Sequence, residues 1–107
     1  MKGMGGGLQQ MMRQANQMQS RIKKLQEELA TREFEGTAGG GAVVAKVSGS
    51  NKVLAMEIKP DVVSADDMEM LQDMIVVAVN EALKVAKETS DQEMSKITGG
   101  VNFPGLS

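Results

Sequence analysis

The sequence contains no cysteine, histidine, tryptophan or tyrosine. Without cysteine, one chain cannot form a disulfide framework, an iron–sulfur cluster or a thiolate zinc site. Without histidine, it lacks the commonest general base and metal ligand. No apolar run approaches the roughly 18 residues that a membrane-spanning helix needs. We therefore expect no cofactor, no metal ion and no membrane partner.

Aromatic side chains are also scarce, because Phe34 and Phe103 are the only two, whereas methionine occurs ten times. An enzyme pocket is usually an enclosed cavity lined by apolar and aromatic side chains, and this sequence offers little to build one. Ser20 and Lys23 match the Ser-x-x-Lys pattern of penicillin-binding enzymes, but the further motifs of those enzymes are missing. We therefore predict a binding protein without enzymatic activity and without a small-molecule substrate.

The length of 107 residues fits one domain, and 41% hydrophobic with 24% charged residues is typical of a folded globular protein. Residues 1–7 are rich in glycine and lack the apolar core of a signal peptide. These features predict a cytoplasmic protein, and the absence of cysteine adds weak support.

Charge is distributed unevenly along the chain. Residues 1–26 contain five basic residues and no acidic residue, a net charge of +5. Residues 27–107 contain seven basic and fourteen acidic residues, a net charge of −7, so the whole chain carries −2. Such asymmetry is typical of a basic arm on an acidic body, and a basic arm suits nucleic acid. A solvated helix face without a ligand is the alternative interpretation.

The first long segment has the period of a helix. Apolar residues recur at heptad spacing from about Leu8 to Arg32, and no glycine or proline lies between these two residues. This heptad seam consists of Leu8, Met11, Ala15, Met18, Ile22, Leu25 and Leu29. Within a single domain of residues 1–107 we therefore predict a flexible leader at residues 1–7 and a basic helical arm at residues 8–33.

Beyond the arm, the pattern changes to the period of two that is typical of strands. A first short strand begins at Phe34, and Gly36 and the glycines 39–41 interrupt it. A turn at residues 49–51 joins the next two strands, and Pro60 ends the last one. The residues that share one face of these two strands are Val43, Ala45 and Val47, and then Leu54, Met56 and Ile58.

A second long helix follows Ser64. Ser64 with Asp67 resembles a capping box, and the glycines 99–100 end the helix. Residues 34–98 are thus predicted to form the sheet and second helix, and residues 99–107 an irregular tail. The expected fold class is α+β, with an αβββα protomer in which a three-stranded antiparallel meander lies between two long helices.

The apolar arc of the second helix is too wide for a monomer. At about 100° per residue the arc spans roughly 200°, whereas a surface helix needs a stripe of somewhat over ~100°. The arc consists of Leu71, Met74, Val76, Ala78, Val79, Ala82 and Leu83. The meander covers one side of it, and the first helix has its own seam to bury. We therefore predict a homodimer that associates through the sheet and second helix.

Basic and amide side chains form a stripe along the first helix, off the heptad seam. Arg13, Gln17, Arg21 and Lys24 follow the spacing i, i+4, i+8 and i+11, with Asn16 and Lys23 beside them. Lys and Arg can meet successive phosphates, and amides can bond to phosphates or base edges. The stripe has no aromatic residue for base stacking, which favours duplex DNA over single strands or RNA. The predicted DNA-binding residues are Arg13, Gln17, Arg21, Lys23 and Lys24.

Several segments together form a recognisable pattern. They are the glycine-rich residues 1–7, QMMRQANQM at 10–18, EGTAGGG at 35–41, DDMEMLQD at 66–73, VNEA at 79–82 and MSKITGGVNFPG at 94–105. In their order and spacing, over nearly the whole chain, the sequence resembles the YbaB/EbfC family of bacterial nucleoid-associated DNA-binding proteins.

The resemblance implies an αβββα protomer that dimerises through its sheet and second helix, with projecting helices that form tweezers. It also implies a DNA-binding protein of the nucleoid that affects chromosome organisation and gene expression. It supplies no binding motif residue by residue, so the DNA-binding residues rest on the charge argument. The alternative is a non-enzymatic adaptor or structural dimer that binds a protein partner through its heptad helix. An enzyme ranks third.

Overall fold

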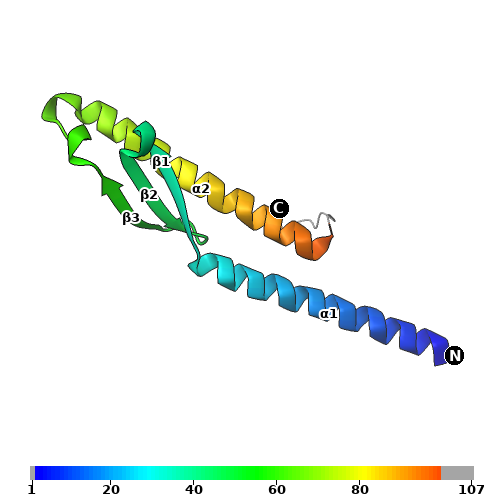
Figure 1. The fold of residues 1–107 in the computed structure, drawn as a ribbon. Coiled ribbons are helices and arrows are strands. Elements are labelled where there is room, and N and C mark those ends of the chain that lie inside the picture. Colours follow the sequence, from blue (N-terminus) through cyan, green and yellow to red (C-terminus); the bar gives the residue numbers. More distant parts are fainter. Residues whose placement is uncertain (1, 100–107) are drawn as a thin grey trace.

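Two long helices and a three-stranded antiparallel sheet make up the protein (Figure 1). The computed structural model describes residues 2–99. The main elements are α1 (Lys2–Thr31), β1 (Glu33–Ala38), β2 (Val43–Ser48), β3 (Val53–Ile58) and α2 (Met68–Thr98). This order confirms the predicted α+β fold and its αβββα arrangement.

The core lies between α2 and one face of the sheet. β2 is the central strand, with β1 and β3 antiparallel on either side. Val43, Ala45 and Val47 alternate along β2 toward the same face, and each is fully buried. Phe34 of β1 joins them in the core. The period of two in the sequence therefore predicted the buried face of the central strand correctly, because side chains alternate across a sheet.

β1 runs unbroken through Gly36, which pairs with Ala45 of β2. The predicted interruption of this strand at Gly36 is therefore wrong. A Cβ atom on Gly36 would overlap the carbonyl oxygen of Ala78 and the amide nitrogen of Ala82 in α2. Glycine in this strand lets the helix backbone approach the sheet closely. The small side chains of Ala78 and Ala82, both fully buried, permit the same approach from the helix.

α1 begins at Lys2, so the predicted boundary between a leader and a helix at Leu8 is wrong. Glycine costs about 1 kcal/mol relative to alanine in a helix, but unlike proline it keeps its N–H donor. A helix that is already nucleated further along can therefore extend through residues 2–7. The predicted tail falls on Gly99 and residues 100–107, and the latter lie outside the described residues.

The two ends of α2 differ in how well the sequence predicted them. Gly99 follows the helix with a left-handed φ of 63°, and its N–H donates to the carbonyl of Ser95, as a glycine stop predicts. At the start, Ser64 Oγ accepts a hydrogen bond from the Asp66 N–H at 3.3 Å. A short 3-10 turn at Ala65–Asp67 follows, so Ser64 caps this turn rather than α2 itself.

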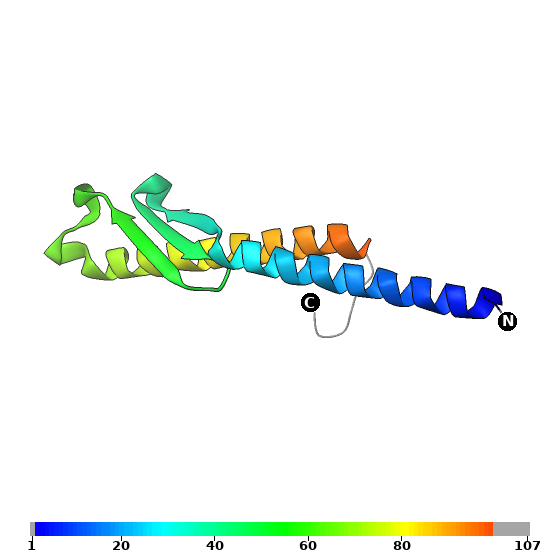
Figure 2. The same cartoon turned by 90° about the horizontal axis from the view of Figure 1, so that it is seen from below.

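The molecule is elongated and measures 79 Å along its longest axis. α1 and α2 run in opposite directions, and both views show that the first part of α1 extends beyond the end of α2 (Figures 1 and 2). α1 therefore projects from the body, by which we mean the sheet together with α2.

Candidate nucleic-acid interface

The predicted DNA-binding side chains all lie on the exposed surface of α1. They are Arg13, Gln17, Arg21, Lys23 and Lys24. The sequence of α1 has no carboxylate before Glu27. Among the described residues, none of these four cations forms an ion pair with a carboxylate elsewhere. No ion pair within the described protomer therefore ties up these four side chains.

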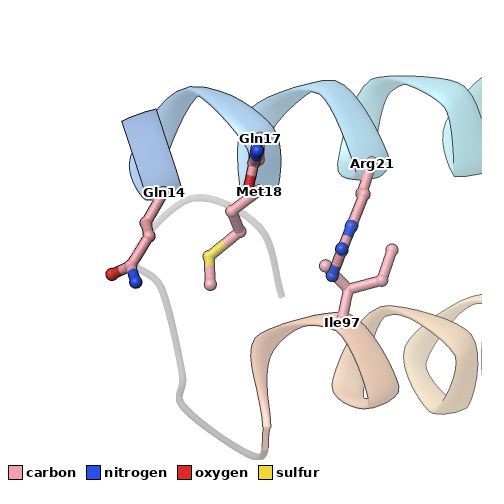
Figure 3. A pocket seen from close by; sticks show the side chains of 5 residues that line it. All are labelled: Gln14, Gln17, Met18, Arg21 and Ile97. Carbon is pink, nitrogen blue, oxygen red and sulfur yellow. The ribbon is translucent and has the colours of Figure 1, made fainter. Parts of the chain in front are cut away.

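Part of this surface borders a contact with α2. A shallow groove of about 230 Å³ between the two helices is lined by Gln14, Gln17, Met18, Arg21 and Ile97 (Figure 3). Arg21 extends from α1 toward Ile97 of α2 and Gln17 also lines the groove, whereas Arg13 and Lys24 do not. The stripe is thus divided, because α2 lies against a flank of α1 that the charge pattern did not reveal. The spacing of the stripe residues also gave no sign that Gln14 would line the groove.

The heptad seam is covered only near the body. Leu29 is buried, and Ile22 and Leu25 are half-buried. Further out, Leu8 and Met11 are 60% and 68% exposed. Figure 2 shows why, since α2 ends before it reaches the first turns of α1. Within residues 7–99, the outer part of the seam is therefore an apolar helix face without a partner.

Two lysines of the body are held by carboxylates, in contrast to the cations of the arm. On the outer face of the sheet, Lys46 Nζ lies 3.3 Å from Glu57 and 3.9 Å from Glu35. The hydrogen bond to Glu57 and the charges of Glu57 and Glu35 raise the pKa of Lys46 above its usual value. On α2, Lys96 donates to Glu93 at 3.1 Å. These lysines are therefore partly neutralised before any polyanion approaches.

A second apolar surface lies on the body. α2 packs over β1 and β2 and leaves β3 largely uncovered, so Val53, Leu54 and Ile58 are 52%, 48% and 36% exposed. On α2, Val76 is 57% exposed and Leu83 is half-buried. β3 is also an edge strand, with β2 as its neighbour on one side. Open sheet edges and clustered apolar side chains are typical of association surfaces.

Fold and charge together define a class of protein. A helix with exposed cations that form no ion pair in the described part of the chain projects from a small α+β body, and the residues of that body carry a net negative charge. Across residues 2–99, no group of three or more carboxylates is arranged to hold a metal ion, and no helix is long and apolar enough to span a membrane. The arrangement is that of a protein with a cationic helical arm suited to a polyanion.

The chain belongs to the YbaB/EbfC DNA-binding family, whose model matches residues 4–101. The nucleoid-associated protein of Clostridium novyi (strain NT) is 51% identical over 106 residues, which cover 97% of this chain and 93% of the relative. That of Pelotomaculum thermopropionicum is 50% identical over 103 residues, covering 96% and 98%. A crystal structure of an uncharacterized Helicobacter pylori protein has the same fold, with a TM-score of 0.66 at 21% identity over 88% of this chain and 92% of that one. The family resemblance of the sequence is thereby confirmed.

Proposed function

We propose that this protein is a homodimeric nucleoid-associated protein that grips duplex DNA with the α1 helices of its two protomers. The observation that carries this proposal is the set of exposed cations on a projecting helix that form no ion pair among the described residues. Duplex DNA presents one negative charge per about 1.7 Å of its axis, so unneutralised Lys and Arg side chains bind it by releasing counterions. The family and the names of its relatives support DNA as the ligand.

Duplex DNA fits the arm better than single strands do. α1 contains no aromatic residue, and proteins that bind single strands use aromatic side chains as stacking platforms. From Arg13 to Lys24, α1 extends by about 16 Å, at ~1.5 Å per residue, which is long enough to follow successive phosphates. The role proposed is therefore binding rather than catalysis, at the nucleoid in the cytoplasm, with effects on chromosome organisation and gene expression.

The homodimer part of the proposal rests on the second apolar surface. The exposed side chains of β3 and of the α2 flank are apolar area that a second copy can bury. Two-fold pairing presents the same patch from both protomers, and it is the commonest symmetry of soluble oligomers. Such a dimer would hold two α1 arms, one from each protomer, as two prongs on either side of a duplex.

A second candidate function is that of an adaptor that binds a protein partner through the heptad seam. The exposure of Leu8 and Met11 favours it, because a helix face with apolar residues at heptad spacing suits a partner helix. The charges of the arm do not depend on that face, so the two functions predict different responses to salt. An adaptor without a DNA site would show no binding to duplex DNA even at low salt.

A salt titration tests DNA binding by the arm. Each neutralised phosphate adds about −0.9 to the slope of log affinity against log salt concentration. Arg13, Arg21 and Lys24 from two arms allow about six contacts, so we expect a slope of about −5. Arg21→Ala with Lys24→Ala leaves about two contacts, so binding should weaken for every sequence and the slope should fall to about −2. Fluorescence anisotropy with unrelated duplexes measures both quantities.

A matched control removes the same charge from the body. Lys84→Ala with Lys87→Ala also deletes two exposed cations, but from α2. This control should keep a steep slope close to that of the wild type, and circular dichroism should show that all three proteins are folded. If the folded arm variant keeps the wild-type affinity and slope, the arm is not the DNA site. The basic residues to examine next are then those of the body: Lys46, Lys52, Lys59, Lys84, Lys87 and Lys96.

A further inference from the structure

The C-terminal end of α1 rests against the hairpin turn between β2 and β3, residues 49–51. α1 has no glycine after it to satisfy its last carbonyl groups, and the chain continues through Arg32 directly into β1. The turn supplies a donor to one of these carbonyls and another to Arg32, the residue that follows α1. Ser50 Oγ donates to the carbonyl of Ala30 at 3.4 Å, and the Gly49 N–H donates to the carbonyl of Arg32 at 3.2 Å.

Gly49 lies directly on the backbone of α1. A Cβ atom there would overlap the carbonyl oxygen of Leu29 and lie 2.6 Å from its carbonyl carbon. Gly49 does not have a positive φ, so the close approach, rather than the backbone conformation, requires glycine. Leu29 is itself buried in the core, so α1 cannot give way here without disturbing its own anchor. This contact between two backbones is therefore fixed.

The turn itself is well supported. The Ser48 N–H donates to the carbonyl of Lys52 at 2.8 Å, and the Lys52 N–H donates to Ser48 Oγ at 3.3 Å. The hydroxyl groups of Ser48 and Ser50 lie 2.7 Å apart, and the Asn51 N–H donates to the carbonyl of Ser48 at 3.0 Å. A turn held by four hydrogen bonds can act as a rigid support for the helix end.

We propose that Gly49 and Ser50 are positioning residues for DNA binding, because the turn sets the direction in which α1 leaves the body. The proposal rests on the proposed function of the arm. Arg13 lies about 24 Å along the helix from Leu29, so a rotation of about 15° at Leu29 moves Arg13 by roughly 6 Å. A charged hydrogen bond to phosphate requires a distance of about 3 Å, so such a displacement breaks it. The turn thus determines whether both arms can meet one duplex.

Electron spin resonance on labelled protein tests this proposal, and the absence of native cysteine makes labelling specific. Labels attached through Gln10→Cys on α1 and Glu88→Cys on α2, both exposed positions, report the angle between arm and body. Labelled chains are diluted with unlabelled ones so that distances within one protomer dominate. Gly49→Ala should shift this distance by about 5 Å and weaken duplex binding by at least about tenfold. Ser50→Ala should give a smaller shift and a smaller loss.

Gly40→Ala is the matched control. Gly40 has a φ of 68° and open space around it, so alanine strains the backbone of the body without touching α1. It should leave both the distance and the affinity unchanged. The proposal is overturned if folded Gly49→Ala keeps the wild-type distance, or if the distance shifts and the affinity does not change. If Gly49→Ala does not fold, an unchanged distance and affinity in Ser50→Ala overturns it equally.

The same measurements separate this proposal from the proposed function. If wild-type protein binds no duplex DNA, the function of the arm is wrong, and no residue can position it for DNA. The distance shift in Gly49→Ala then still shows whether the turn sets the direction of α1. If wild-type protein binds DNA but Gly49→Ala leaves the distance between the two labels unchanged, the arm binds DNA and the turn does not set its direction.

Discussion

Gly36→Val is expected to abolish folding at 37 °C or to lower the midpoint of thermal unfolding more than any other single change considered. The new Cβ would overlap the backbone of α2 at Ala78 and Ala82, where no side chain can move aside. Overpacking with side chains alone costs about 1–3 kcal/mol, and separating α2 from the sheet would expose further core. Total stabilities are only about 5–15 kcal/mol, so the loss is a large share. Thermal and urea unfolding followed by circular dichroism measure it.

Thr37→Val is the control for this prediction, because it adds a β-branched apolar residue next to Gly36 in the same strand. Thr37 is exposed on the opposite side of β1, so the change should stay within about 0.5 kcal/mol of wild type. A Gly36→Val protein with wild-type stability would show that α2 does not pack this closely on β1 in solution.

Val76→Asp is expected to separate the proposed homodimer into folded monomers. Val76 is 57% exposed in the protomer, so aspartate there is solvated in the monomer and desolvated only in an interface. An unpaired buried charge costs about 3–5 kcal/mol, which should raise the dissociation constant by more than about 100-fold. Light scattering at micromolar concentration measures the mass, and circular dichroism confirms the fold. Leu83→Asp should also dissociate the dimer and in addition destabilise the protomer, because Leu83 packs against the core.

Val77→Asp is the matched control for Val76→Asp. Val77 is 55% exposed, nearly the same as its neighbour, but it points about 100° further round α2, outside the predicted apolar arc. The Val77→Asp protein should therefore remain dimeric. A wild-type protein that is a well-folded monomer at micromolar concentration would refute the homodimer, and dissociation of both variants alike would show that the interface is not confined to the predicted apolar arc.

Local periodicity predicted most of the secondary structure of the protein. The alternation of Val43, Ala45 and Val47 predicted the buried face of β2, and Gly99 predicted the end of α2. Both signals are local, since they depend on side-chain alternation and on one left-handed residue. The start of α1 was predicted wrongly, because glycine weakens a helix without ending it.

The exposed cations of the arm could also be predicted, since charge and helical spacing are properties of neighbouring residues. The groove beside them could not, because it forms only where Ile97 of α2 meets Arg21 of α1. The same limit applies to two glycines. Gly36 looked like an interruption and Gly49 like an ordinary turn residue, and each lies in fact against the backbone of a helix.

The sequence by itself determined the chemical character of this protein: a basic first helix without a carboxylate before Glu27, an acidic remainder, and no cysteine or histidine. It also determined the elements, because hydrophobic periodicity is written into neighbouring residues. Only the tertiary structure decided which surfaces remain uncovered, such as β3 and the outer heptad seam, and how the end of α1 is held by residues 49–50. These features depend on contacts between segments far apart in the chain, and no local pattern encodes the distance at which two backbones meet.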